Sequence, residues 1–135
     1  MTRMSPKNFL RDQSGSATIE TVLWLPFFAF FITFFVDVAM IFQGQARALK
    51  VIQEANRELS IGAYTSISDF EARVMADLTA MGMAPDSLDT SIVAGVVTTR
   101  ALIPTDALAV VGLFTPLTSF QVGVGSEMMI ENWEV

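Results

Sequence analysis

The sequence predicts an α+β protein with one long N-terminal helix and a small C-terminal domain in which a second helix packs on an antiparallel β-sheet. Three observations carry this prediction. Residues 21–42 form an almost uninterrupted apolar block, residues 43–60 are rich in helix-forming residues, and residues 91–130 contain β-branched and alternating segments.

The composition describes two unlike segments joined end to end. The chain has 135 residues, of which 52% are hydrophobic and 16% are charged. Globular domains are typically about 25% charged, so the apolar content is high. The excess is concentrated, because Asp37 is the only charged residue between Thr21 and Ala46. We therefore expect one membrane-compatible segment and one ordinary acidic domain.

The charge and the missing residue types exclude several function classes. The net charge is −6 and no basic cluster is present, which argues against nucleic acid as a partner. The chain has no cysteine and no histidine, so disulfides, the usual zinc sites, cysteine nucleophiles and histidine bases are all excluded. Asp86, Asp89 and Asp106 lie in turn-like contexts, where aspartate is common for backbone reasons. We expect no catalytic residues, no metal site and no cofactor.

Residues 1–15 form a short polar leader that precedes the apolar block. The leader carries a net charge of +2 from Arg3, Lys7 and Arg11 against Asp12. Residues 21–42 would span roughly 33 Å as a helix, which matches the ~30 Å hydrocarbon core of a bilayer. Positive flanks stay in the cytoplasm, so we expect the N-terminus inside and the C-terminal part exported.

The helix is predicted to continue beyond the apolar block. In residues 43–60 an apolar stripe recurs every three or four positions, formed by Leu49, Ile52, Ala55 and Leu59. We expect one continuous helix over residues 16–62, membrane-spanning at about 21–42 and amphipathic at about 43–60, ending near Gly62. Pro26 is tolerated because it lies near the start and because membrane helices accommodate proline.

Residues 63–135 are predicted to form the small exported α+β domain. Ser68 with Glu71 resembles a capping box, and Gly82 resembles a helix stop. The helix between them would bury Phe70, Val74, Leu78 and Met81. Residues 84–89 are expected to form a turn, and β-structure is expected from Ser91. Residues 120–130 alternate apolar and polar side chains, as in a strand with one buried face.

Two carboxylates are unusual because they flank or interrupt the apolar block. Glu20 stands directly before it, and a glutamate near a helix N-terminus interacts favourably with the helix dipole. Asp37 lies 17 positions later, near the exported end. We expect Asp37 either to reach the outer membrane–water boundary or to face a neighbouring helix.

The stretch "GSATIETVLWLPFF", together with the basic leader, resembles type IV prepilins and in particular the TadE-like pseudopilin family. The shared features are the glycine at position 15, small residues, a glutamate five positions later and a long apolar helix. The resemblance implies a pilin-like fold and cleavage by a prepilin peptidase between Gly15 and Ser16. The mature chain would keep 120 residues with a net side-chain charge of −8. It further implies that Glu20 pairs with the new Ser16 α-amine of its own or an adjoining subunit.

The resemblance implies a structural role in the bacterial inner membrane. The protein would be a minor pilin or pseudopilin of a tight-adherence (Flp-type) pilus or related secretion system. Its partners would be other pilins through the N-terminal helix, the assembly platform proteins and an assembly ATPase. The chain would be single-pass, with a periplasmic C-terminal domain that enters an extracellular pilus on assembly.

Two other interpretations of the apolar block remain open. The chain is either a single-pass anchor with a small periplasmic binding domain, which would keep residues 1–15, or a secreted protein. In the secreted form, signal peptidase would cut near Ala46 or Ala48. The apolar block is longer than the 7–15 residues typical of such signals.

Overall fold

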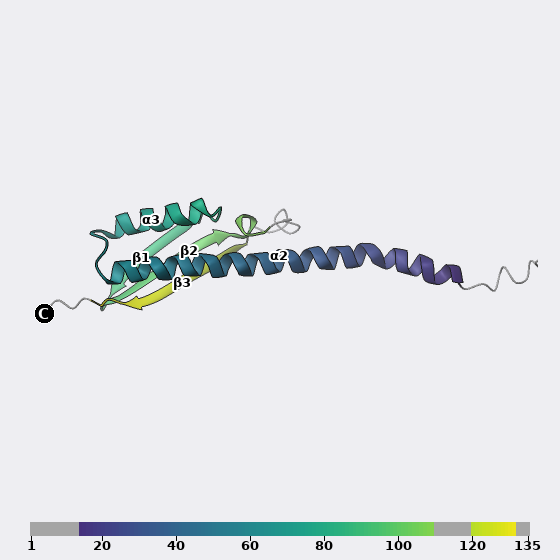
Figure 1. Cartoon of the computed structure of the whole chain (residues 1–135), viewed down its shortest axis with the longest axis horizontal. Helices are drawn as coiled ribbons and strands as arrows, with labels where there is room; N and C mark the ends of the chain where they lie inside the picture. The colour runs from purple at the N-terminus through teal and green to yellow at the C-terminus, as the bar shows by residue number, and fades with distance from the viewer. Residues whose placement is uncertain (1–13, 110–119, 132–135) are drawn as a thin grey trace, which may run out of the picture. The chain divides into compact units, whose positions relative to one another are not determined.

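The computed structural model describes residues 14–109 and 120–131. The chain order is α2 (Ser14–Ser60), α3 (Ile67–Ala80), β1 (Ser87–Val93), β2 (Val96–Pro104), the 3₁₀ helix η1 (Thr105–Ala107) and β3 (Gln121–Met129). Figure 1 shows these elements along the chain. The chain divides into two compact units, residues 1–35 and 36–135. The α+β prediction is confirmed, while residues 1–13 of the predicted leader lie outside the described residues.

The helix α2 is 47 residues long and passes through Pro26 without interruption. A proline removes one intrahelical hydrogen bond, here the one that the carbonyl of Val22 would accept. Consecutive side chains from Val22 to Leu25 are all more than half exposed. Because successive helical residues point in different directions, this part of α2 has no covered face. Among the described residues, α2 is the one helix long and apolar enough to cross a membrane.

Both long helices end as predicted, at glycines in the left-handed conformation. Gly62 has φ +80° and Gly82 has φ +76°, values that a residue without Cβ adopts at little cost. After α2, the amide of Ala63 donates a hydrogen bond to the carbonyl of Glu58. After α3, the amide of Met83 donates one to the carbonyl of Leu78. These are the closing hydrogen bonds of Schellman motifs, which satisfy the last carbonyls of each helix.

The helix α3 begins earlier than its predicted capping box. Its N-cap is Ser66, whose hydroxyl accepts a hydrogen bond from the amide of Asp69 at 3.1 Å. The prediction that Ser68 caps with Glu71 was wrong, because the equivalent Ser–Asp pair two residues upstream performs that role. An Asp at the third helical position also interacts well with the positive end of the helix dipole.

The sheet has three antiparallel strands in the order β1-β2-β3. Strand β1 starts at Ser87, so the predicted turn over residues 84–89 was wrong in its second half. The predicted β-run from Ser91 is divided by a two-residue turn at Ala94 and Gly95 into β1 and β2. Strand β3 confirms the predicted alternation, with Val124 buried at its centre.

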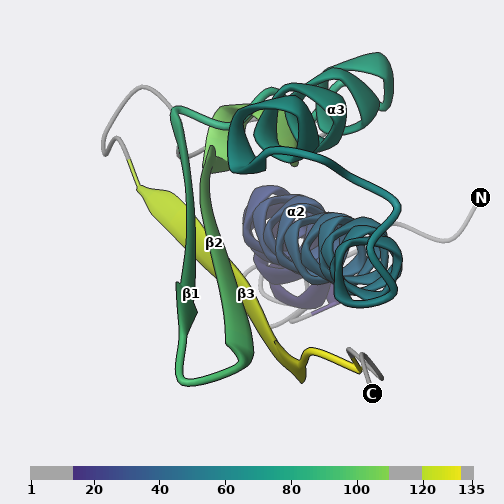
Figure 2. The same ribbon diagram turned by 90° about the vertical axis from the view of Figure 1, so that its left-hand side faces the viewer.

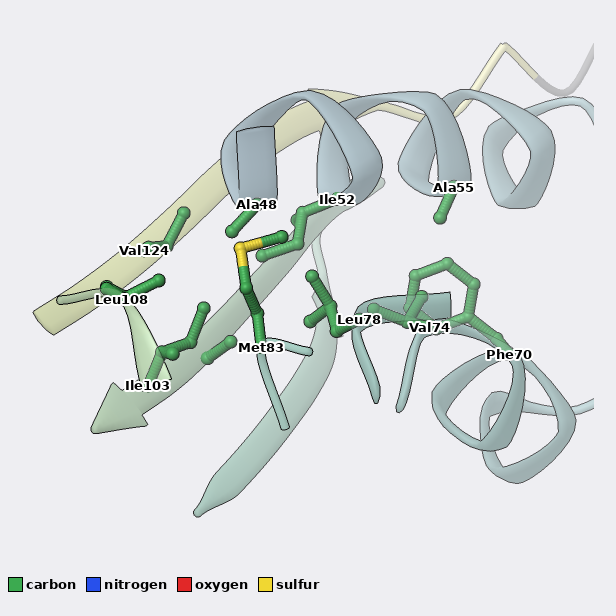
Figure 3. Packing of buried hydrophobic residues seen from close by; sticks show 11 residues of the cluster. Ala48, Ile52, Ala55, Phe70, Val74, Leu78, Met83, Ile103, Leu108 and Val124 are labelled. Carbon is green, nitrogen blue, oxygen red and sulfur yellow. The ribbon is translucent and has the colours of Figure 1, made fainter. Parts of the chain in front are cut away.

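The core of the unit 36–135 lies between one face of the sheet and two helices. Figure 2 shows α3 and the second half of α2 on the same face of the sheet, and Figure 3 shows their buried side chains converging. The cluster consists of Ala48, Ile52, Ala55, Phe70, Val74, Leu78, Met83, Ala101, Ile103, Leu108 and Val124. The predicted burial of Met81 was wrong: it is 56% exposed, and Met83 is buried instead because the chain turns at Gly82.

Candidate assembly site

The predicted cleavage bond lies in the first turn of α2. Gly15 and Ser16 follow Ser14, where the helix begins. The first amide groups of a helix have no intrahelical acceptors, so this turn is the least costly part of α2 to unwind. A peptidase that needs an extended substrate would therefore have to open only this turn.

Glu20 lies on a helix face that also carries aromatic side chains. It lines a shallow surface depression together with Thr21, Trp24, Leu25 and Phe28. Residues four apart stack on one face of a helix, so Glu20, Trp24 and Phe28 form a single line. The Trp24 ring lies 6.5 Å from the Phe28 ring and 5.7 Å from the Phe27 ring. Glu20 is exposed at the start of this line, next to apolar surface.

Glu20 has no basic residue close to it in the sequence of α2. The first Lys or Arg of this helix is Arg47, 27 positions further along. A carboxylate against apolar surface becomes costly when water is removed, and charges in membranes usually find partners. Within α2, the only cation that cleavage could bring near Glu20 is a new α-amine on Ser16, one helical turn away.

Asp37 lies inside the second compact unit, 4% exposed. The chain itself therefore covers this side chain, even though Val36 beside it is 45% exposed. Both alternatives predicted for Asp37, the outer membrane–water boundary and a neighbouring helix, stay predictions.

Asn56 is a buried polar residue whose role is not evident from the sequence. Its side-chain amide donates to the carbonyl of Ser126 on β3 at 3.2 Å, and its oxygen accepts from the Thr99 hydroxyl on β2 at 2.7 Å. Asn56 and Thr99 are both fully buried. A buried amide is costly without partners, so these bonds fix α2 to the two strands in one register. Its only signal in the sequence is a polar residue beside the apolar stripe.

A hollow of about 340 Å³ lies between the second half of α2 and α3. It is lined by Val51, Glu54, Ala55, Glu58, Tyr64, Arg73, Asp77, Ala80 and Met81. Three carboxylates and one guanidinium make this lining acidic. The Tyr64 hydroxyl donates to Glu58 at 2.8 Å, and the Arg73 guanidinium donates to Asp77 at 2.9 Å.

Two pKa values in this hollow are shifted. Partial burial raises the pKa of Tyr64, and the neighbouring Glu58 carboxylate raises it further. The Asp77 carboxylate raises the pKa of Arg73. Both shifts keep the side chains in the protonated form that donates these hydrogen bonds.

The three aspartates considered as acid/base groups all lie at the surface. Asp86 accepts a hydrogen bond from the Gln121 side chain at 2.6 Å, and Asp106 accepts one from the amide of Ala107 at 3.0 Å. Asp89 stands on β1 opposite Arg100 of β2. Within residues 18–109 and 120–131, no group of three Asp or Glu side chains is placed to hold a metal ion.

These features can be compared with known proteins. Residues 15–57 match the TadE-like protein family. The match confirms the predicted resemblance to the TadE-like family over these residues, which lie within α2. The TadE-like segment covers about a third of the chain, beginning at Gly15 and ending at Arg57, so α3 and the sheet lie outside it. No curated protein and no solved structure matches the chain significantly.

Proposed function

We propose that this protein is a minor pilin-like subunit of a tight-adherence pilus or related secretion system, and that its role is assembly rather than catalysis. A prepilin peptidase removes residues 1–15. The α2 helix then holds the subunit in the inner membrane, with the N-terminus cytoplasmic and the unit 36–135 largely periplasmic, until an assembly ATPase and platform proteins incorporate it.

The observation that carries this proposal is the uncovered apolar surface of α2 with one carboxylate at its start. An apolar helix exposed on all sides requires lipid or other helices around it. The TadE-like match begins at Gly15, at the proposed cleavage point, and includes Glu20.

Charge pairing explains why Glu20 is compatible with such a helix. A free α-amine has an ordinary pKa of about 7.7–8.0 and is largely cationic at neutral pH. As packing helices exclude water, Glu20 and the Ser16 α-amine of the same or an adjoining subunit become each other's best partners. This pair sets the axial register, while apolar packing provides most of the association energy.

Replacing Glu20 tests the proposal. Glu20→Ala should leave processing at Gly15 intact and strongly reduce the amount of protein in sheared pilus fractions, because the partner of the Ser16 amine is lost. Immunoblots of membrane and sheared fractions measure both effects, and Thr21→Ala serves as the neighbouring control. Normal incorporation of Glu20→Ala would contradict the assignment of Glu20 to assembly.

A further inference from the structure

Strand β3 is an edge of the sheet, and no other described strand pairs with its outer side. The amide of Ile130 donates to the carbonyl of Gly95, and the amide of Thr105 donates to that of Phe120, which fixes the phase of the β2–β3 hydrogen bonds. In an antiparallel pair the amide and carbonyl of one residue point to the same side, and successive residues alternate. The backbone groups that point away from β2 are therefore those of Gln121, Gly123, Gly125, Glu127 and Met129.

These outward backbone groups are accessible and have no partner in the described part of the chain. All five residues are exposed. The surface of a glycine is backbone, so the exposure of Gly123 and Gly125 is exposure of the strand edge itself. Within residues 14–109 and 120–131, no hydrogen bond satisfies the outward amides and carbonyls of β3. A row of free donors and acceptors is a template for a further strand.

Strand β3 also lacks the features by which exposed edges usually avoid pairing. Such edges are short, carry Lys or Pro, or are twisted by a β-bulge. Strand β3 is nine residues long, has no Lys or Pro, and keeps an unbroken register with β2. Its edge is therefore open to β-strand addition along its whole length.

The glycines of β3 leave room for two side chains of β2. A Cβ atom on Gly125 would lie 3.3 Å from Cγ of Arg100, and one on Gly123 would lie 3.7 Å from Cδ2 of Leu102. Arg100 and Leu102 thus extend toward β3 on the face of the sheet that the helices do not cover. Arg100 is exposed and has no ion pair among the described residues, although Asp89 stands opposite it on β1. Its guanidinium is available to a group placed beside Gly125.

We propose that β3 binds an extended segment of a different protein, which adds to the sheet as a fourth, antiparallel strand. Main-chain hydrogen bonds supply affinity, and every second side chain supplies specificity. From its N-terminus, the segment places a basic residue opposite Glu127, an acidic residue opposite Gly125 and a bulky apolar residue opposite Gly123. Because the glycines have no side chains, the acidic residue reaches Arg100 and the apolar residue covers Leu102.

The strands of a second copy of this chain do not have this pattern. Neither edge strand, β1 or β3, contains a Lys or Arg to face Glu127. Strand β3 also runs in the same direction as the second half of α2, since Asn56 bonds to Ser126 and Ser60 to Met128. Antiparallel pairing of two β3 edges would make the two α2 helices antiparallel, whereas copies anchored in one membrane are parallel. This last step rests on the proposed function.

Synthetic peptides test the docking on the full chain in detergent micelles. The probe is a fluorescein-labelled peptide in which lysine, glutamate and tyrosine, in that order, alternate with threonines. Fluorescence anisotropy should show saturable binding at micromolar concentrations, with empty micelles as the blank. N-methylation of the lysine, glutamate and tyrosine amides, which face β3, should weaken binding about tenfold or more, whereas N-methylation of the threonine amides should change it less than about twofold. Absence of saturable binding, or equal binding of both methylated peptides, would overturn the proposal.

Gly123 offers a matched pair of variants. Its amide points to the free edge, so Gly123→Pro removes a docking donor without breaking a β2–β3 hydrogen bond. Gly123→Ala keeps the donor, and its Cβ makes an ordinary contact with Leu102. With folding checked by circular dichroism, peptide affinity should fall about tenfold in Gly123→Pro and stay within about twofold in Gly123→Ala. Equal affinity of the two folded variants would contradict pairing at this edge.

A charge exchange tests the side-chain pattern. Arg100→Glu should weaken the peptide about tenfold, and replacing the peptide's glutamate with lysine should restore the affinity. An Arg100→Glu variant that binds both peptides equally would show that Arg100 does not select the segment.

Two further measurements separate the alternatives. Sedimentation equilibrium in micelles that detects dimers abolished by Gly123→Pro would overturn the choice of a different protein as occupant. Peptide binding does not depend on processing. A chain from cells that keeps residues 1–15 and binds the peptide would therefore contradict the proposed function alone, and a chain that begins at Ser16 without binding the peptide would contradict the docking alone.

Discussion

Thr90 and Thr99 face each other across β1 and β2, and their hydroxyl groups have different surroundings. Thr99 donates to the Asn56 side chain, which in turn holds β3 through the carbonyl of Ser126. The Thr90 hydroxyl oxygen is buried, and no hydrogen-bond partner lies within reach of it among the described residues. A satisfied buried hydroxyl stabilises the fold, whereas an unsatisfied one is costly.

Replacing threonine with valine should therefore change the stability of the fold in opposite directions at these two positions. Thr99→Val leaves the Asn56 oxygen buried without its donor and should lower the free energy of unfolding by about 1–3 kcal/mol. Thr90→Val removes an unsatisfied hydroxyl group from a strand, where valine is favoured, and should raise the free energy of unfolding by about 1 kcal/mol. Urea titration of the full chain in detergent micelles, followed by near-ultraviolet circular dichroism, measures both. Equal destabilisation by the two variants would contradict the assigned hydrogen bonds.

The folding stability of the unit 36–135 depends on pH in the alkaline range because of Tyr64. Its pKa is raised above the ordinary value of 10.0 by partial burial and by the Glu58 carboxylate. The folded state thus holds the phenolic proton more tightly than the unfolded state does. The resulting stability is fully present below pH 10 and is lost as the pH rises through the folded-state pKa.

The titration of Tyr64 can be observed directly because it is the only tyrosine in the chain. Absorbance of phenolate should rise with a midpoint above that of a free tyrosine. Glu58→Gln should move the midpoint back toward the ordinary value, since it removes the neighbouring charge. A midpoint unchanged by Glu58→Gln would show that the Tyr64–Glu58 hydrogen bond does not affect this pKa.

At the scale of elements, the β1–β2 hairpin contains a strained residue. Val93 pairs with Val96, so Ala94 and Gly95 form a two-residue turn, with φ values of 51° and 77°. Such a turn requires positive φ at both positions and favours Asn-Gly or Asp-Gly sequences. Positive φ is sterically unfavourable for alanine, whereas asparagine tolerates this conformation much better.

Ala94→Asn should consequently stabilise the hairpin by about 1 kcal/mol, and Gly95→Ala should destabilise it by a similar amount. Hydrogen exchange of the amides that pair β1 with β2, measured on the full chain in micelles, reports the change. Faster exchange in Ala94→Asn would contradict the turn geometry.

The elements differ in how far local sequence determines them. Both helix stops could be predicted because Gly62 and Gly82 are local signals. The hairpin was missed because Ala-Gly is a weak turn signal, and the start of α3 was misplaced because the two candidate N-cap serines, Ser66 and Ser68, lie two positions apart. Burial of Met83 rather than Met81 depends on the path of the chain after Gly82, which periodicity within α3 does not specify.

Some parts of the candidate site could be predicted from the sequence, and others depend on the folded structure. Gly15, Ser16 and Glu20 form a motif of contiguous residues, so it could be recognised from the sequence. Asn56 could not, since its partners lie 43 and 70 residues away in the sequence. The hollow between α2 and α3 likewise exists only after the chain has folded back at Gly62.

At the scale of the whole molecule, the two halves of α2 have different surroundings. Its first half exposes apolar side chains on every side, and its second half is an integral part of the folded unit 36–135. We assign the first half to membrane and helix packing, and Glu20 to the register of that packing. This assignment depends on a free amine at Ser16.

The most direct measurement is the N-terminal sequence and intact mass of the protein from cells with and without the prepilin peptidase. We expect a chain that begins at Ser16 in cells with the peptidase and one that retains residues 1–15 in cells without it. An identical mass in both would contradict this assignment, because Glu20 would then have no amine generated by processing to pair with.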